Sequence, residues 1–200
     1  MSNIYFVSDT HFHHRRILEY SNRNFTSVEH MNETLINNWN AVVKPNDKVY
    51  HLGDFAFCSI EQFEQLLNRL NGEIHIVTGN HDKVILRNQS RILSGNKVKS
   101  IQQYLEFNYN KQHIVLFHYG CRVWHWSYKG SILLYGHSHG RLPPYGRSMD
   151  VGVDSAVITT EYRPVSIKEV LDFMDKQPFG LESDDQERRD YWATKNEQVP

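Results

Sequence analysis

Each of five short apolar runs in this chain is followed within two residues by Asp, Asn or His. In three of them a glycine stands between the run and that residue. These side chains can bind metal ions or transfer protons. Because ligands of α/β sheets bind beyond the carboxyl ends of the strands, we expect the side chains to converge on one site. The residues concerned are Asp9, His11, Asp54, Asn80, His81, Asp82, His118, His137 and His139.

The donor types in this set indicate divalent metal ions. Carboxylate, amide and imidazole groups together suit Mn, Fe, Zn and Ni, and the lack of a thiolate disfavours a structural zinc site. Even seven of these nine side chains are too many ligands for one ion that also binds water and substrate. They fit two ions that share one bridging carboxylate. In Asp9-x-His11 and His137-x-His139, alternate side chains lie on one side of an extended segment, so each pair can face the same cleft.

Taken singly, each of these motifs is also typical of a hydrogen-bonded structural residue. Asp-x-His is a weak pattern, whereas Gly-Asn-His-Asp at 79–82 and Gly-His-Ser-His at 136–139 are moderately specific. It is the succession of all five motifs, each directly after an apolar run, that favours one common site over independent structural roles.

Apolar stripes with helical spacing predict three helices. Thr26 and Glu29 have the spacing of a capping box, as do Ser166 and Glu169. Ser59 opens another helix, which Asn71-Gly72 closes. The predicted helices cover 28–43, 60–70 and 167–176.

Short β-rich runs alternate with these helices in the first half and follow one another in the second. Helical crossovers imply parallel pairing in the first half. The whole order, βαβαβ and then mostly strands, favours a sandwich of two sheets with helices outside. Strands are predicted at 4–7, 49–52, 74–78, 132–135 and near 149–153, with a hairpin made by 98–109 and 112–118.

Composition excludes several classes of protein. The chain has 200 residues, of which 40% are hydrophobic, enough for a packed core and too many for intrinsic disorder. Its 22 Lys and Arg balance 23 Asp and Glu, which disfavours non-specific binding of long nucleic acid. Two cysteines are too few for a disulfide framework. With no long apolar segment and no signal peptide at 1–7, we expect a cytoplasmic protein without a membrane span.

The order of the motifs resembles that of the calcineurin-like metallophosphoesterases, and more closely a small single-domain branch found in bacteria and their viruses. The similarity covers about residues 3–175 and departs from the branch at His13, usually Gly, and at Gly120, often Pro. It implies a four-layer α/β/β/α sandwich, with a metallophosphoesterase domain at 1–182 and a polar tail at 183–200. The matching segments are Asp9-Thr10-His11-Phe12 with His14, His51-Leu52-Gly53-Asp54, Gly79-Asn80-His81-Asp82, His118-Tyr119, Gly136-His137-Ser138-His139 and Met149–Asp154.

The resemblance also implies a role for each motif residue. Two divalent ions would be bound, manganese as the first expectation with iron, nickel or zinc as alternatives. Asp54 would bridge them, His81 would act as general acid and Asp82 would orient His81. One ion would be held by Asp9, His11 and His139, and the other by Asn80, His118 and His137.

The expected activity is hydrolysis of a phosphate ester, a small phosphodiester or nucleotide, through a water activated between the two ions. His14 would contact substrate or support a ligand, and Arg141 would bind phosphate. Trp124-His125-Trp126 is either an aromatic platform for a ring or a packed loop. The alternatives are a non-catalytic metal-binding interaction scaffold of the same fold and a hydrolase of a non-phosphate bond. The oligomeric state is left open.

Overall fold

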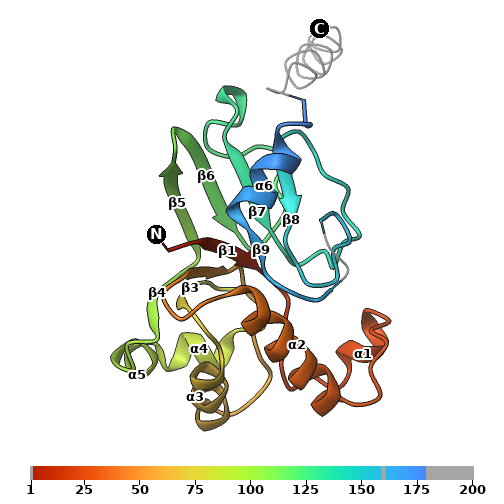
Figure 1. Cartoon of the computed structure of the whole chain (residues 1–200), viewed down its shortest axis with the longest axis vertical. Helices are drawn as coiled ribbons and strands as arrows, with labels where there is room; N and C mark the ends of the chain where they lie inside the picture. The colour runs from red at the N-terminus through yellow and green to blue at the C-terminus, as the bar shows by residue number, and fades with distance from the viewer. Residues whose placement is uncertain (1, 159–160, 179–200) are drawn as a thin grey trace, which may run out of the picture.

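Two β-sheets lie face to face in the computed structural model, which describes residues 2–158 and 161–178 (Figure 1). The first sheet has the order β4-β3-β2-β1-β9, in which β1 to β4 are parallel and β9 is antiparallel to β1. Its parallel strands therefore end at the same edge, as the helical crossovers predict. The strands are β1 (Ile4–Val7), β2 (Lys48–His51), β3 (Glu73–Val77), β4 (Val98–Gln102) and β9 (Val165–Ser166).

The second sheet has the order β5-β6-β7-β8. β5 and β6 are antiparallel, whereas β6, β7 and β8 run parallel. Its inner face packs on the first sheet through Ile114, Leu116 and Ile132, which meet Phe6 and Leu52. Burying one such side chain stabilises the fold by about 1.5–3 kcal/mol. The strands are β5 (Tyr104–Tyr109), β6 (Gln112–Phe117), β7 (Ile132–Tyr135) and β8 (Ser148–Asp150).

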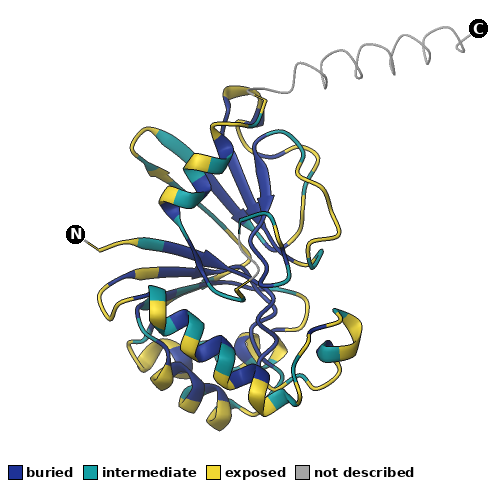
Figure 2. Cartoon of the chain, turned by 45° about the vertical axis from the view of Figure 1, so that its right-hand side comes forward, coloured by how far each residue is buried: buried dark blue, intermediate teal, exposed yellow. Residues whose placement is uncertain are grey.

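Helices cover the outer face of the first sheet, with their buried sides toward it (Figure 2). α2 (Val28–Val42) and α3 (Ile60–Arg69) supply most of this layer, with α4 (Lys83–Arg87) and α5 (Gln89–Ser94) beside them. α6 (Ile167–Met174) packs instead into the core between the sheets. A short α1 (Ile17–Tyr20) lies near α2. The two-sheet α/β sandwich predicted from the sequence is confirmed.

Helix caps agree with the sequence at two of three positions. Ser59 and Ser166 both form complete capping boxes, with Gln62 and Glu169 as their partners. The box predicted between Thr26 and Glu29 is wrong, because Ser27 is the N-cap and accepts a hydrogen bond from the backbone N–H of His30. Thr26 lies one residue too early and bonds the His30 imidazole.

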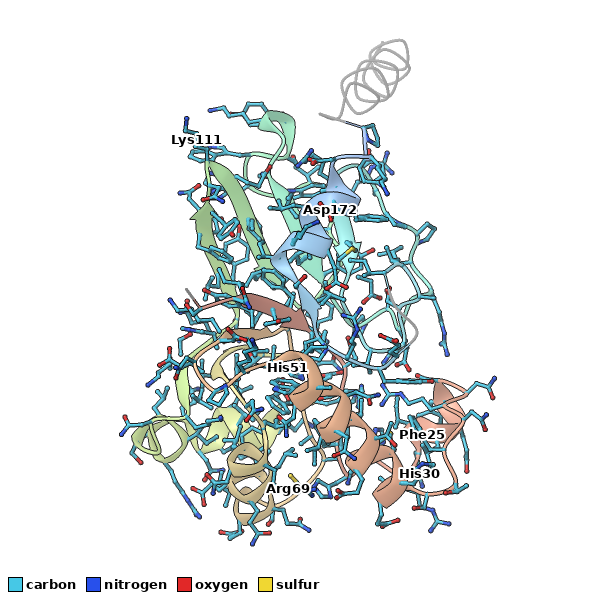
Figure 3. The ribbon with its side chains drawn as sticks, viewed as in Figure 1. Phe25, His30, His51, Arg69, Lys111 and Asp172 are labelled. Atoms are coloured by element: carbon cyan, nitrogen blue, oxygen red, sulfur yellow. The ribbon has the colours of Figure 1, made fainter. Side chains whose placement is uncertain are left out.

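The run at 98–109 does not form one hairpin strand. It divides at Gln103, so that β4 pairs parallel with β3 in the first sheet and β5 pairs antiparallel with β6 in the second. The apolar pattern alone cannot show this crossing, since both halves have strand character. The predicted turn at Asn110-Lys111 is confirmed, and both residues have positive φ (47° and 68°), as a tight hairpin turn requires. Lys111 marks the tip of this hairpin (Figure 3).

The outer face of the second sheet has a different cover from that of the first. Trp124 packs there against Val115, Leu133 and Tyr135. Trp124 belongs to the connection between β6 and β7, whose helical content is the single turn η1 (Ser127–Lys129). Within 2–158 and 161–178, this irregular segment therefore covers the part of the outer face around Val115 and Leu133.

None of the helices in the described part of the chain is both long and apolar enough to cross a membrane. The predicted polar tail at 183–200 lies outside the described residues.

Candidate metal centre

The candidate ligands meet where the parallel strands end, in an unusual backbone conformation. Asp9, His11, Asp54, His137 and His139 all have positive φ, between 49° and 66°. This left-handed conformation is uncommon for residues with a side chain and is found at functional sites where the fold overdetermines it. The turns after β1, β2 and β7 therefore present these side chains at some cost in backbone energy.

Two glycines allow these turns to approach one another. Gly53 has φ of +96°, and a Cβ placed on it would lie 2.4 Å from the backbone N of Gly79. A Cβ on Gly136 would lie 2.0 Å from Oγ of Ser8 and 2.3 Å from a carboxylate oxygen of Asp9. The glycine that precedes a ligand in these motifs thus makes room for the loop or side chain beside it.

One group of candidate ligands consists of Asp9, His11 and His139. Oδ1 of Asp9 lies 3.9 Å from Nε2 of His11 and 3.8 Å from Nε2 of His139. Both Asp9 and His11 are almost fully buried, yet Asp9 Oδ1 and His11 Nε2 have no hydrogen-bond partner among the described residues. A buried polar atom without a partner is costly, and a shared metal ion would satisfy both atoms.

The second group contains Asp54, Asn80, His118 and His137. Nε2 of His118 lies 3.2 Å from Oδ1 of Asn80, and ligand atoms of Asp54, His118 and His137 all lie within 4.8 Å of one another. Nδ1–H of His118 donates to the Leu52 carbonyl at 2.7 Å. Since a neutral imidazole has one proton, this bond leaves the Nε2 lone pair directed at the group.

Asp54 joins the two groups through one oxygen. Its Oδ2 lies 3.7 Å from Nε2 of His11 and 3.6 Å from Nε2 of His118. Its Oδ1 accepts a hydrogen bond of 2.9 Å from the backbone N–H of His81. A hydrogen bond therefore holds Oδ1, while Oδ2 faces ligands from both groups.

The donor set fits divalent ions electrostatically. Burial raises the pKa of the Asp9 carboxyl to about 8, so a charged Asp9 at neutral pH needs a cation beside it. Burial strongly lowers the pKa of His11, which keeps its imidazole neutral, as metal coordination requires. The residues present are consistent with two bound ions, with Asp54 between them.

Behind His139 lies a buried ion pair that the sequence motifs do not reveal. Nδ1–H of His139 donates to Asp154 at 2.6 Å, and Asp154 is in turn bonded by Arg23 through two nitrogens, at 2.8 and 2.7 Å. Arg23 also donates to the backbone carbonyls of Asp9 and Thr10. Burial opposes the charge on Asp154, but the bonds from His139 and Arg23 bring its pKa below the usual value. The arrangement orients His139 with Nε2 toward Asp9.

His14 supports a ligand of the first group. Its Nδ1 lies 3.2 Å from Nδ1 of His11, and its ring stacks on Phe57 at 3.8 Å. Phe57 also faces the rings of His11 and His81, at 5.4 and 5.1 Å. Of the two roles expected for His14, the structure supplies the contact with a ligand. Phe57, which was not predicted from the sequence, packs against the rings of all three histidines.

Asp82 has partners different from those expected. Its carboxylate accepts backbone N–H bonds from Asp54, Phe55 and Gly79, at 2.9, 2.9 and 2.8 Å, and makes no hydrogen bond to the His81 imidazole in the described residues. The expectation that Asp82 orients His81 is therefore corrected. Asp82 fixes the two turns that carry Asp54 and Asn80, because its buried carboxylate satisfies their backbone donors.

The remaining predicted residues lie near the rim. His81 is exposed, and its ring centroid is 6.0 Å from that of His11. Arg141 is also exposed, and its guanidinium donates to the Tyr20 carbonyl at 2.6 Å, so its observed contact ties the turn after β7 to α1. Its predicted binding of phosphate stays a prediction.

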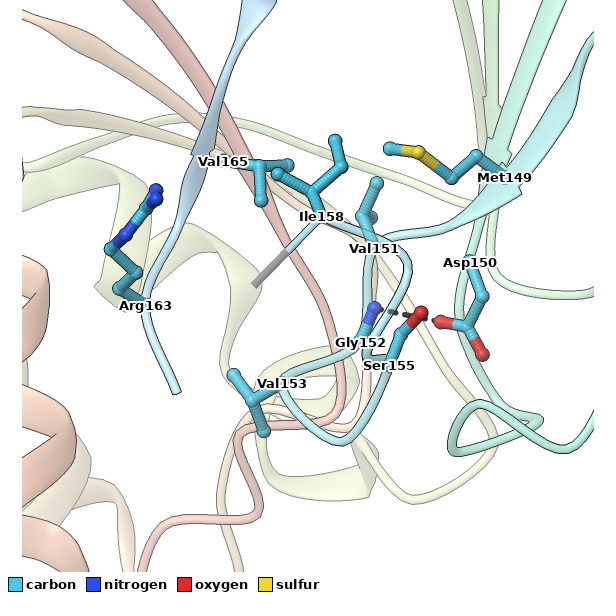
Figure 4. A pocket seen from close by; sticks show the side chains of 9 residues that line it. All are labelled: Met149, Asp150, Val151, Gly152, Val153, Ser155, Ile158, Arg163 and Val165. Atoms are coloured by element: carbon cyan, nitrogen blue, oxygen red, sulfur yellow. Dashed lines mark hydrogen bonds between the residues drawn. The ribbon is translucent and has the colours of Figure 1, made fainter. Parts of the chain in front are cut away.

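Two further polar residues form hydrogen bonds with the segments that carry the candidate ligands. His51, marked in Figure 3, is fully buried and contacts Oγ1 of Thr10 at 2.9 Å. Asp150 accepts bonds from Ser138, Gly140 and the backbone N–H of Gly152. The last of these bonds borders a small cavity of about 10 Å³ between 149–158 and 163–165 (Figure 4). Asp150 thus links the turn that carries His137 and His139 to the segment after β8.

Comparisons with known proteins agree with this geometry. A model of the calcineurin-like phosphoesterase superfamily domain matches residues 2–150. The uncharacterized protein MJ1445 of Methanocaldococcus jannaschii is 35% identical over 185 residues, which cover 88% of this chain and 93% of that protein. The Gene 66 protein of Mycobacterium phage L5 is 35% identical over 85 residues, 41% of each chain. A solved structure from Aquifex aeolicus, a protein of unknown function named AQ665, has a TM-score of 0.66 at 23% identity and covers 86% of this chain and 99% of its own.

Proposed function

The chain belongs to the calcineurin-like phosphoesterase superfamily, and we propose that it hydrolyses a small phosphodiester or nucleotide with two divalent ions. The observation that carries this proposal is the position of Asp54. One of its oxygens lies 3.7 Å from His11 Nε2 and 3.6 Å from His118 Nε2, between ligands of two separate groups. A carboxylate so placed can neutralise two cations at once.

The proposed ligands divide as the two groups do. Asp9, His11 and His139 hold one ion, Asn80, His118 and His137 hold the other, and Asp54 is shared. Bound together, two such ions polarise the phosphate oxygens and lower the pKa of a water between them. Asn80 contributes an oxygen donor without a further negative charge, which keeps the site attractive to an anionic ester. Manganese suits the carboxylate and amide oxygens of Asp9, Asp54 and Asn80, and iron, nickel and zinc also suit the four imidazoles.

His81 is proposed as the general acid. Its backbone N–H is fixed on Asp54 Oδ1, while its exposed imidazole makes no hydrogen bond to another described residue. The ring can therefore turn toward a substrate and give its proton to the departing oxygen. Phe57 restricts the ring on one side at a centroid distance of 5.1 Å. As the oxygen of the attacking water would bond to phosphorus, the bond to the leaving oxygen would break and that oxygen would accept the proton.

Charge favours a small substrate over a long nucleic acid. The net charge is −1, and Arg23, the fully buried arginine nearest the site, is already paired with Asp154. Long polyanions are held by many separate basic contacts, and the balanced composition offers no excess of them.

An assay of the whole chain loaded with Mn²⁺ tests the proposal. Bis-p-nitrophenyl phosphate, p-nitrophenyl phosphate and cyclic nucleotides would be compared, with protein treated with a chelator as control. Metal-dependent turnover of the diesters above that of the monoester is expected. Faster turnover of the monoester would overturn the diester preference. A chain that binds two ions per molecule yet hydrolyses none of these esters would favour the non-catalytic scaffold.

A further inference from the structure

A second cluster of metal-binding side chains lies on the outer face of the second sheet. Oε2 of Glu106 on β5 is 3.0 Å from Nε2 of His113 on β6 and 2.7 Å from Nδ1 of His125 in the β6–β7 connection. The three candidate ligand atoms all lie within 4.8 Å of one another. Neighbouring ligands on a tetrahedral first-row ion with bonds of about 2.1 Å are separated by about 3.4 Å, a few tenths of an ångström more than the two distances to Glu106. The cluster is therefore close to the size that such an ion requires.

This cluster is separate from the proposed catalytic centre. His113 lies near the start of β6, whereas His118 follows its end, and five residues of strand span about 16 Å. Glu106 pairs with Val115, which packs in the outer core with Trp124, so Glu106 faces away from the first sheet. His113 is the diagonal neighbour of Glu106 on that face.

The hydrogen bonds around His113 point to a cation. Its Nδ1 lies 3.1 Å from Oδ1 of Asn108, while its Nε2 lies 3.0 Å from the Glu106 carboxylate. A neutral imidazole carries one proton and can donate to only one of these oxygens, whereas an imidazolium donates to both, so the contacts call for a positive charge as a second proton or as a bound ion. When Nδ1–H donates to Asn108, Nε2 directs a lone pair at the Glu106 carboxylate, and the two acceptors repel each other. A cation bound between them would be coordinated by both groups and remove that repulsion.

Both His113 and Glu106 have partners that fix them as ligands. Asn108 accepts from the far nitrogen of His113, and the hydroxyl of Tyr104 donates to the other oxygen of Glu106. Such outer partners are typical of metal-ligating histidines and carboxylates. The side chains of Glu106 and His113 are 24% and 12% exposed, and that of His125 is 45% exposed, so the cluster opens to solvent on the His125 side. An ion could enter there and keep an exchangeable position.

We propose that Glu106, His113 and His125 form a binding site for one first-row divalent ion of the zinc type, distinct from the catalytic pair. Two imidazoles and one carboxylate suit Zn²⁺, and nickel and copper also accept imidazole. The ion fastens the Trp124–Trp126 segment to the outer face of the sheet.

Zinc content measured by equilibrium dialysis tests this site in the full-length chain. Wild type should bind one Zn²⁺ more than His125→Ala, or bind that ion more than about 100-fold more tightly, since loss of an outer partner alone costs 10–100-fold. Glu106→Gln should behave like His125→Ala, because it keeps the size of the side chain and removes its charge. His30→Ala, which changes an exposed histidine on α2, is the matched control and should bind as wild type. Equal zinc content together with equal affinity in wild type and His125→Ala would show an ion-paired cluster only and overturn the proposal. The comparison does not depend on how many ions the catalytic groups bind.

Tryptophan fluorescence locates the ion. The ring of Trp126 lies 4.7 Å from that of His113 and 4.6 Å from that of His125, so Ni²⁺ bound there should quench its emission. The quenching should be lost in His125→Ala and in Trp126→Phe. If His125→Ala and Trp126→Phe were quenched as strongly as wild type, the Ni²⁺ would lie elsewhere and the assignment would be wrong.

Discussion

The two groups of candidate ligands at the proposed catalytic centre are built in different ways. In the first, Asp9 and His11 are buried, and His139 is held by the Asp154–Arg23 pair while His11 is held by His14. In the second, His118 is buried but Asn80 and His137 are exposed. The first group is therefore enclosed and held by other side chains, whereas the second is open to solvent on the side where the proposed substrate would bind. Asp54 is the one residue that belongs to both.

Asp54→Asn should have the largest effect, because it keeps the shape of the shared ligand and removes its charge. We expect the bound metal to fall below two ions per chain and activity to fall below detection. Metal analysis of dialysed protein beside a phosphodiesterase assay would measure both. An unchanged stoichiometry in this variant would mean that Asp54 is not shared.

His81→Ala should leave both groups intact and lower kcat by about 10²–10⁴-fold for an ester with a poorly leaving alkoxide. The loss should be smaller for a p-nitrophenyl ester, whose leaving group departs without a proton. Steady-state kinetics with the two classes of ester would compare these losses. Equal losses for both would remove the acid role and leave His81 as a contact to phosphate.

Asp154→Asn tests the bracing of the first group. The fully buried guanidinium of Arg23 would lose its charge partner, so the free energy of unfolding should fall by about 3–5 kcal/mol. Metal affinity of the first group should fall by about 10–100-fold, since His139 loses its orienting carboxylate. Chemical denaturation and metal titration would give the two values.

A matched control for Asp154→Asn is Glu33→Gln, which breaks the pair with Arg69 between two half-exposed side chains. That change should cost less than about 1 kcal/mol. If the two substitutions destabilise the chain equally, the buried pair does not brace the site.

Metal binding should also depend on pH in a defined direction. Burial raises the pKa of Asp9 to about 8 in the metal-free fold, so at lower pH an incoming ion must displace its proton. The affinity for metal should therefore rise by about tenfold per pH unit as pH increases toward 8 and level off above it.

The stability of the metal-free chain should change with pH in the opposite direction. The unfolded carboxyl of Asp9 ionises near pH 4 while the folded one keeps its proton, so this group lowers the free energy of unfolding as pH rises from about 4 to 8. Calorimetric titrations and denaturation at several pH values would check both signs.

Much of this account can be predicted from local sequence. The apolar runs and their Gly-Asp, Gly-Asn-His-Asp and Gly-His-x-His endings place nearly all candidate ligands at the correct strand ends, because a short strand and its turn are encoded by adjacent residues. The capping boxes at Ser59 and Ser166 are local for the same reason.

The features that sequence could not give depend on distant contacts. Arg23 and Asp154 are 131 residues apart, and although Asp154 ends the matching segment Met149–Asp154, nothing in that segment indicates Arg23 as its partner. Two of the three backbone partners of Asp82, Phe55 and Asp54, come from a turn 27 and 28 residues earlier, which no spacing rule predicts. The split of 98–109 between two sheets follows from the competing partners β3 and β6, because the pattern of that segment suits both.

The proposed function requires two ions that lie side by side across Asp54. Low-temperature electron paramagnetic resonance of the full-length chain, loaded with Mn²⁺ to saturation, tests it most directly, because two Mn²⁺ ions that share a carboxylate are magnetically coupled. We predict a coupled-pair spectrum in wild type, which Asp54→Asn abolishes. A spectrum of isolated ions at saturation in wild type would contradict the account.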